Sequence, residues 1–171
     1  YCGTNTAEIM NIEANKQDGE NKNVDRDWAW YLGQVSKCNN IICNIDRILA
    51  ADNTMTQKEH DQWLAEAYCW RSWNLFQMSQ LWGDIPLVNT IPPAITADNI
   101  EEVYGEYFPA RAPIADVYAQ IISDLEFATK HAPEVDSANK FLFTKAFAHG
   151  MLARVYAEKT ARNWSKVAEH C

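Results

Sequence analysis

The chain has 171 residues, a hydrophobic fraction of 47% and a formal net charge of -8. Such a composition predicts an ordered globular protein, and we interpret residues 1–171 as a single domain. The acidic balance, without a Lys/Arg cluster, argues against a surface for nucleic acid or for anionic lipid headgroups. No apolar run of about 18 residues is present, so the sequence predicts no membrane-spanning helix.

The first 23 residues are polar, and apolar residues are sparse after Ile12. The segment around residues 17–20 has the composition of a turn. We therefore predict that residues 1–23 form an irregular or loosely paired lead-in. Taken alone, the amides of Asn21 and Asn23 are expected in a solvated loop.

The first helix is predicted over residues 24–51, opened by a carboxylate at Asp25 or Asp27. Its apolar stripe recurs at helical spacing and comprises Leu32, Val35, Ile42, Ile45 and Leu49. Trp28 and Trp30 occupy alternate positions near its start and cannot both face inward. One of them is therefore expected to be exposed.

Residues 61–88 are the stretch around which the chain is organised. A capping box of Thr56 and Glu59 opens a helix over residues 57–82. Gly83 and Pro86 then end it, so residues 85–88 should be extended. Arg71 lies among apolar residues and should be buried with a carboxylate or carbonyl partner. Two adjacent apolar stripes predict packing on several sides, with the tryptophans in the core: Trp63, Trp70, Trp73 and Trp82.

The second half begins with a long connection over residues 89–110, which we predict to be non-helical. A connection of this length inside a compact domain is often functional. Helices are then predicted over residues 112–132 and 144–159, the first with Pro113 in its opening turn and the second capped by Thr144. A fifth helix begins at Asn163-Trp164.

The sequence favours a protein that is not an enzyme and that needs no cofactor or metal. No two of its four histidines stand at metal-ligand spacing, and His60, Glu59 and Asp61 should splay apart on their helix. No nucleophile elbow, phosphate loop or dinucleotide motif occurs. Carboxylate pairs such as Asp116 and Asp124 are expected on solvated faces. Most of the five cysteines are predicted to be buried thiols.

Three strings of residues resemble the SusD/RagB family of nutrient-binding lipoproteins of Bacteroidota. The first contains Glu66-Ala67, Arg71 and, after two aromatic positions, the run LWGDIPLV at residues 81–88. The second is RAPIADVYAQIISDLEFA at residues 111–128, and the third is TKAFAHGMLARVY at residues 144–156. Serine at 72 and tryptophan at 82 depart mildly from the family pattern. The resemblance covers residues 24–171.

The resemblance implies an all-α fold of tetratricopeptide-like helical hairpins with long irregular loops. It implies capture of a glycan or other small nutrient at the cell surface and delivery to a SusC-like TonB-dependent transporter, without bond cleavage. The protein would be lipid-anchored in the outer membrane. Family members are several hundred residues long, so we expect this chain to be the N-terminal part of a larger protein.

An adaptor built of tetratricopeptide-like repeats, binding a peptide or protein, is the alternative. A glycosidase would need two carboxylates that face each other across a cleft. Aromatic rings can stack on the C–H faces of sugars, and amides can bind hydroxyls. The candidate ligand-binding residues are therefore exposed aromatics and nearby amides: Trp28, Trp30, Asn21, Asn23, Tyr104 and Tyr107.

Overall fold

The computed structural model describes residues 7–16, 20–21, 28–135 and 138–171. Compactness divides the chain into two units, residues 1–30 and residues 31–171. Asn23, Asp25, Asp27 and Cys2 lie outside the described residues, as does the predicted start of the first long helix at residue 24. Each unit is described by itself below.

The first unit contains a short helix, α1 (Ala7–Glu13), where the sequence predicted irregular structure. The prediction was wrong because Ala7, Met10 and Glu13 are all good helix formers at helical spacing. The helix ends where Asn15 adopts a positive φ of 53°, a conformation that asparagine tolerates better than most residues. Asparagine at this place is a common end to a helix.

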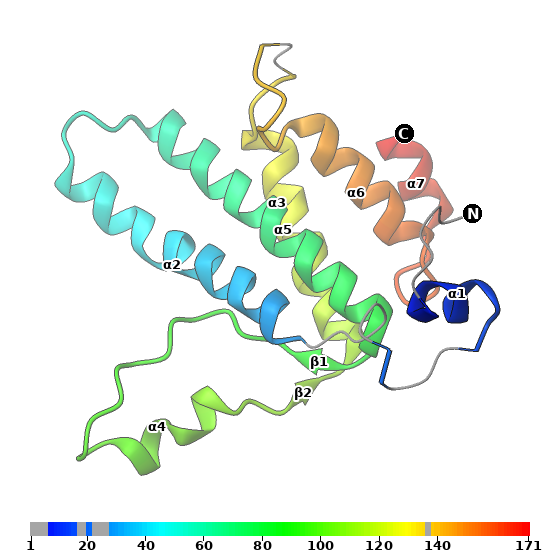
Figure 1. The fold of residues 1–171 in the computed structure, drawn as a ribbon. Helices are drawn as coiled ribbons and strands as arrows, with labels where there is room; N and C mark the ends of the chain where they lie inside the picture. Colours follow the sequence, from blue (N-terminus) through cyan, green and yellow to red (C-terminus); the bar gives the residue numbers. More distant parts are fainter. Residues whose placement is uncertain (1–6, 17–19, 22–27, 136–137) are drawn as a thin grey trace. The chain divides into compact units, whose positions relative to one another are not determined.

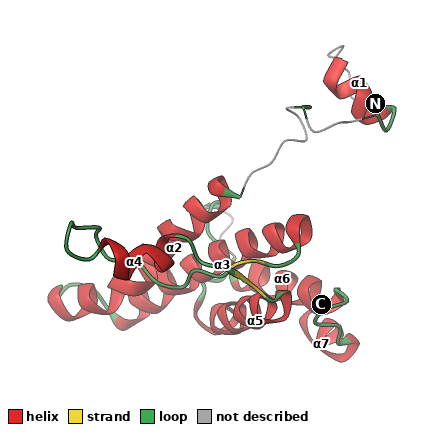
Figure 2. Cartoon of the chain, turned by 90° about the horizontal axis from the view of Figure 1, so that it is seen from below, coloured by secondary structure: helices red, strands yellow, loops and turns green. Residues whose placement is uncertain are grey.

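The second unit is built from helices, as predicted, and two very short strands (Figures 1 and 2). Its long helices lie within a few residues of the predicted ranges. The elements in chain order are α2 (Ala29–Ala51), α3 (Gln57–Trp82), β1 (Ile85–Pro86), α4 (Ile100–Tyr107), β2 (Arg111–Ala112), α5 (Ile114–His131), α6 (Lys145–Ala157) and α7 (Trp164–His170). Helix α2 begins at the boundary between the two units.

Both ends of α3 are formed as the sequence predicted. The Thr56 side chain accepts a hydrogen bond from the Glu59 N–H, and the Glu59 carboxylate accepts from the Thr56 N–H. At the other end Gly83 has a φ of 69°, which only glycine adopts without strain. The chain then leaves as β1, which pairs antiparallel with β2.

Helix α5 packs between α3 and α6, and α7 packs on α6. The apolar core between these helices is fully buried and includes Leu75 and Met78 of α3, Ile121 and Leu125 of α5, and Leu152 of α6. Asp84 links the turn after α3 to α5, because its Oδ1 accepts from the Ile114 N–H at 2.8 Å. Pro113 is the N-cap of α5, so the helix begins two residues later than predicted.

The prediction that Arg71 is buried and paired is confirmed. Its Nε and Nη2 each donate to one oxygen of Asp124 at 2.8 Å, and its Nη1 donates to the Asn39 Oδ1 at 2.9 Å. Asn39 therefore joins α2 to α3, and its amide nitrogen also donates to the Val88 carbonyl at 2.8 Å. The prediction that Asp124 is solvated was wrong, since this carboxylate is buried opposite the guanidinium.

The connection between β1 and β2 carries a helix, α4, where the sequence predicted a non-helical segment (Figure 1). Ile100, Val103, Tyr104 and Tyr107 do recur at helical spacing, but the pattern spans only eight residues and was overlooked in the long connection. Within α4 only Val103 is buried. Asn99 is the N-cap residue, and its side chain accepts from the Thr96 N–H at 2.7 Å in the turn before the helix. Among the helices that the structure describes, none is long and apolar enough to cross a membrane.

Candidate functional site

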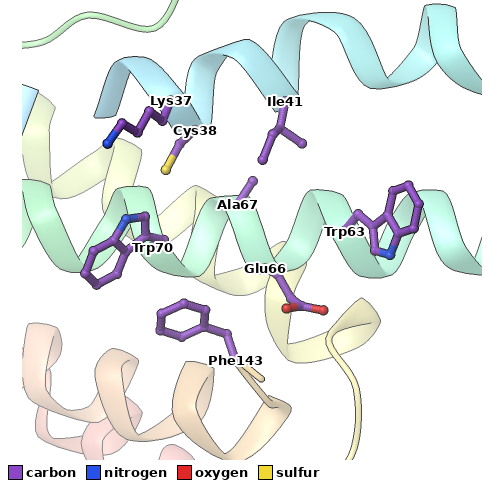
Figure 3. Close-up of a pocket in the computed structure, with 8 residues that line it drawn as sticks. All are labelled: Lys37, Cys38, Ile41, Trp63, Glu66, Ala67, Trp70 and Phe143. Atoms are coloured by element: carbon purple, nitrogen blue, oxygen red, sulfur yellow. The ribbon is translucent and has the colours of Figure 1, made fainter. Parts of the chain in front are cut away.

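An aromatic cleft lies between α2, α3 and the segment that precedes α6 (Figure 3). Its volume is about 480 Å³, within the range of small-molecule sites, which runs from about 300 to 1,000 Å³. Lys37, Cys38 and Ile41 reach into it from α2. The opposite wall comprises Trp63, Glu66, Ala67 and Trp70 of α3, with Phe143.

The helical repeat explains why α3 presents these residues together. Positions 63, 66, 67 and 70 are three or four residues apart, so their side chains form one stripe along the helix. Trp70 stacks on Trp73 with ring centroids 5.1 Å apart and lies 5.7 Å from the Phe143 ring. Trp63 is 51% exposed. The wall therefore holds its rings in place and leaves aromatic surface open to a ligand.

The polar groups of the cleft are few and lie among apolar atoms. Glu66 accepts a hydrogen bond from the Gln62 amide at 3.2 Å, and Lys37 extends from the facing helix. Burial raises the pKa of the Cys38 thiol to about 11, so this sulfur stays protonated and is a poor nucleophile. An apolar floor with one carboxylate and one ammonium suits binding of a neutral, amphipathic ligand.

The sequence placed the tryptophans of α3 in the core, and the structure corrects this. Trp63 is exposed, and Trp70, Trp73 and Trp82 are only half-buried. Two apolar stripes were read correctly, but only one of them is covered, by α5. The cleft was missed because periodicity shows that a stripe is apolar and does not show whether a neighbour covers it. Phe143 gave no signal, since it lies outside any helical pattern.

Tyr104 and Tyr107 of α4 lie together on the surface, as predicted candidates should. Tyr104 is 60% exposed, and its ring lies 4.7 Å from that of Phe108, which is also exposed. The Tyr107 hydroxyl donates to the Pro93 carbonyl at 2.7 Å, which fixes its ring against the connection. These two residues remain candidates for stacking on a ligand.

The other predicted site residues belong to the first unit. Trp30 is exposed and Trp28 is half-buried, so the expectation that they cannot both face inward is confirmed. Asn21 is buried. Asn23 lies outside the described residues.

Two histidine contacts in the structure were not expected from the sequence. His60 does meet Asp61, since its Nδ1 lies 2.8 Å from the Asp61 Oδ1. His149 of α6 and His170 of α7 also approach, with 2.9 Å between their Nδ1 atoms. Burial and the nearby His149 lower the pKa of His170. Across the described residues, no group of three His, Cys, Asp or Glu side chains could hold a metal ion.

The cysteines divide evenly between interior and surface among the four that the structure describes. Cys38 and Cys69 are buried, and Cys43 and Cys171 are exposed, all as free thiols. Burial raises the pKa of Cys69 to about 12. The prediction that most thiols are buried is therefore not confirmed among these four, since Cys43 is exposed although it lies within α2.

A profile of a SusD-like protein family, described as "Starch-binding associating with outer membrane", matches residues 3–157. The chain belongs to this SusD-like family. No curated protein matches the chain significantly.

Solved SusD-like structures share the fold at low sequence identity. A SusD-like carbohydrate-binding protein from Bacteroides fragilis aligns with a TM-score of 0.70 at 16% identity, over 98% of this chain and 30% of its own. A laminarin-binding SusD-like protein aligns with a TM-score of 0.66 at 18% identity, over 84% and 28%. A protein solved with a xylogluco-oligosaccharide aligns with a TM-score of 0.56 at 24% identity, over 75% and 23%. This chain spans less than a third of the length of each.

The residues that resemble the family are structural ones in this chain. Arg71 and Asp124 form the buried pair, Gly83 ends α3, and Asp84 caps α5. Two residues of the first family-like string, Glu66 and Ala67, also line the cleft, and Trp70 directly precedes Arg71 of that string. The family-like strings thus explain the SusD-like fold, and they leave the ligand to be argued from the surface.

Proposed function

We propose that this SusD-like chain binds a glycan in the aromatic cleft between α2 and α3. The observation that carries the proposal is the concave stripe of Trp63, Glu66 and Trp70, which combines open aromatic surface with a carboxylate. Sugar rings present C–H faces that pack on indole rings, while their hydroxyls need polar partners. Glu66 can accept from a hydroxyl, and Lys37 on the opposite wall can donate to one.

The family and its solved relatives support the ligand class. The family description names starch, and two structurally similar proteins bind laminarin or were solved with a xylogluco-oligosaccharide. All three ligands are neutral polysaccharides or fragments of them. Because the lining of the cleft is largely apolar and aromatic, it suits the uncharged pyranose rings that these ligands share.

The wider role that we propose follows the family. As part of an outer-membrane, lipid-anchored protein at the cell surface, the chain would pass its glycan to a SusC-like TonB-dependent transporter. It would bind the glycan without cleaving it. The exposed pair on α4, Tyr104 and Tyr107, is a second proposed contact surface. Trp28, Trp30 and Asn23 stay predicted ligand contacts, whereas Asn21 is buried and would need to be uncovered to meet a ligand.

The test is calorimetric titration with oligosaccharides derived from starch, laminarin and xyloglucan. Trp63→Ala should weaken binding at least about tenfold, since buried aromatic anchors commonly contribute more than 1.4 kcal/mol. Trp164→Ala is the matched control, because this exposed indole lies on α7, outside the cleft. Loss in Tyr104→Ala or Trp30→Ala instead would move the site to those residues. Absence of binding to every glycan would favour a peptide-binding adaptor.

A further inference from the structure

A buried histidine joins the two helices that form the walls of the cleft. His60 of α3 is 5% exposed, and both of its ring nitrogens face aspartates. Nδ1 lies 2.8 Å from the Asp61 Oδ1, and Nε2 lies 2.8 Å from the Asp46 Oδ1 on α2. An ionised carboxylate can only accept hydrogen bonds. Both contacts are therefore hydrogen bonds only when the ring carries two protons and a positive charge.

The two aspartates differ in how firmly they are held. Asp61 also accepts from the Gln57 amide at 2.7 Å, and its Oδ2 lies 3.3 Å from Nδ1 of His131 on α5. The side chain of Asp46 is 90% exposed. When His60 loses one proton, Asp46 can be hydrated at little cost, whereas Asp61 is partly enclosed. The Gln57 amide nitrogen also lies 3.1 Å from Nδ1, but an unprotonated Nδ1 would still face the Asp61 carboxylate at 2.8 Å. The proton should therefore leave from Nε2, which breaks the contact between His60 and Asp46.

Burial and the two aspartates set the pH at which the His60 contact breaks. Other charged groups lie nearby. Lys58 of α3, Lys130 of α5 and Lys145 of α6 line a polar cavity of about 680 Å³ with Asp61, His131 and Glu134. Burial disfavours the charged ring of His60, but hydrogen bonds to Asp61 and Asp46 and the charges of these aspartates outweigh it. The pKa of His60 is accordingly raised above the ordinary histidine value of 6.5.

The direction of the pH effect follows from this shift. A raised histidine pKa contributes stability that is fully present below pH 6.5 and is lost as the pH rises through the folded-state value. The pKa of Asp61 is lowered, chiefly by its hydrogen bond with His60, so its contribution holds above pH 3.8 and is lost as the pH falls through its lowered value. Both hydrogen bonds of His60, to Asp46 and to Asp61, are therefore present at mildly acidic pH.

We propose that His60 is a proton-dependent clasp that holds α2 against α3 and so sets the opening of the aromatic cleft. The same two helices carry both features. Trp63 follows His60 by one helical turn on α3, and Ile41 precedes Asp46 on α2. Loss of the proton loosens the part of α2 that follows the Asn39 contact with Arg71, and Ile41, the wall residue on that side, moves with it. The consequence for a ligand rests on the proposed function, whereas the clasp itself does not.

Ring-nitrogen NMR and amide hydrogen exchange test the clasp directly. On titration from pH 5.5 to 8.5, His60 should lose its proton above pH 6.5 and keep the proton on Nδ1. Protection of α2 amides, corrected for intrinsic exchange, should fall over the same interval, by about tenfold for each unit by which the folded pKa exceeds the unfolded one. Asp46→Asn should lower the His60 pKa and abolish the pH dependence of α2 protection.

The control is Asp98→Asn, which removes the same charge from the exposed connection before α4. It should leave both the His60 titration and the α2 protection as in the parent. An unchanged His60 pKa in Asp46→Asn would overturn the proposal, and so would α2 protection that is equal at pH 5.5 and 8.5. Retention of the proton on Nε2 would also overturn it.

Glycan titration at the same two pH values then separates the two proposals. Affinity that changes with pH in the parent and not in Asp46→Asn supports control of the cleft by the clasp. Absence of glycan binding at either pH contradicts the proposed function and leaves the exchange result intact. Affinity that is independent of pH while α2 protection changes would refute the link between clasp and cleft.

Discussion

The two sides of α3 are both apolar, but only one of them is closed. Toward α5, Leu75 and Met78 pack against Ile121 and Leu125, and every one of these side chains is fully buried. Toward α2, Trp63 and Trp70 line a cleft, and α2 is held to the rest of the unit both by buried apolar residues such as Val35 and Ile45 and by polar contacts of Asn39. One helix can therefore contribute one apolar stripe to the core and use its neighbouring stripe as a binding surface.

The largest expected effect is at the centre of the closed side. Arg71→Ala removes the partner of the buried Asp124 carboxylate and should lower the free energy of unfolding by about 3–5 kcal/mol. Burial already raises the pKa of Asp124 despite the guanidinium, so a carboxylate left with the Gln120 hydrogen bond and no cation is costly. Urea denaturation provides the measurement. Arg71→Met with Asp124→Leu should lose much less, and a single variant as stable as the parent would contradict the buried pair.

A pair of truncations compares the two sides directly. Leu125→Ala leaves a cavity where α5 meets α3 and should cost about 2–5 kcal/mol. Trp63→Ala removes a larger side chain, but one that is half exposed, and should cost less than about 1 kcal/mol. Both values come from the same urea titrations. Equal losses in the two variants would mean that the α2 side is packed as tightly as the α5 side.

A smaller effect is expected where the chain turns from α2 into α3. Thr56→Ala deletes the hydroxyl that accepts from the Glu59 N–H and should cost about 1 kcal/mol. The matched control is Thr160→Ala, an exposed threonine in the turn after α6. Thermal unfolding should show a lower midpoint for the first variant alone. A loss of the same size in both would show that the capping box contributes nothing particular.

Local chemistry predicted much of the fold from the sequence. The capping box at Thr56, the glycine that ends α3 and the apolar stripe of α5 each specify a helix boundary or a buried face on their own. The same reasoning identified Arg71 as buried, since a cation inside an apolar stripe has few alternatives. It could not name Asp124, because a partner 53 residues away is chosen by the packing of α3 on α5.

The site was predicted less completely, for a physical reason. Helical periodicity shows that Trp63 and Trp70 share an apolar stripe. Whether α2 buries that stripe depends on how closely α2 approaches α3, which the sequence does not show. Asp46 and His60 gave no signal, because each looks like a solvated residue until the helices bring them together. The exposure of Tyr104 and Tyr107 was easier to predict, since they lie in a long connection outside the main helical pattern, and their role in binding stays a prediction.

One crossed measurement tests most directly the claim that α3 separates a structural side from a binding side. Ile121→Val and Trp63→Ala are each assayed for unfolding by urea and for binding of the tightest oligosaccharide found with the parent. Ile121→Val should lose about 0.5–1.5 kcal/mol of stability and keep its affinity. Trp63→Ala should keep most of its stability and lose at least about tenfold in affinity. Retained affinity in Trp63→Ala, with lost affinity in Ile121→Val, would contradict the account.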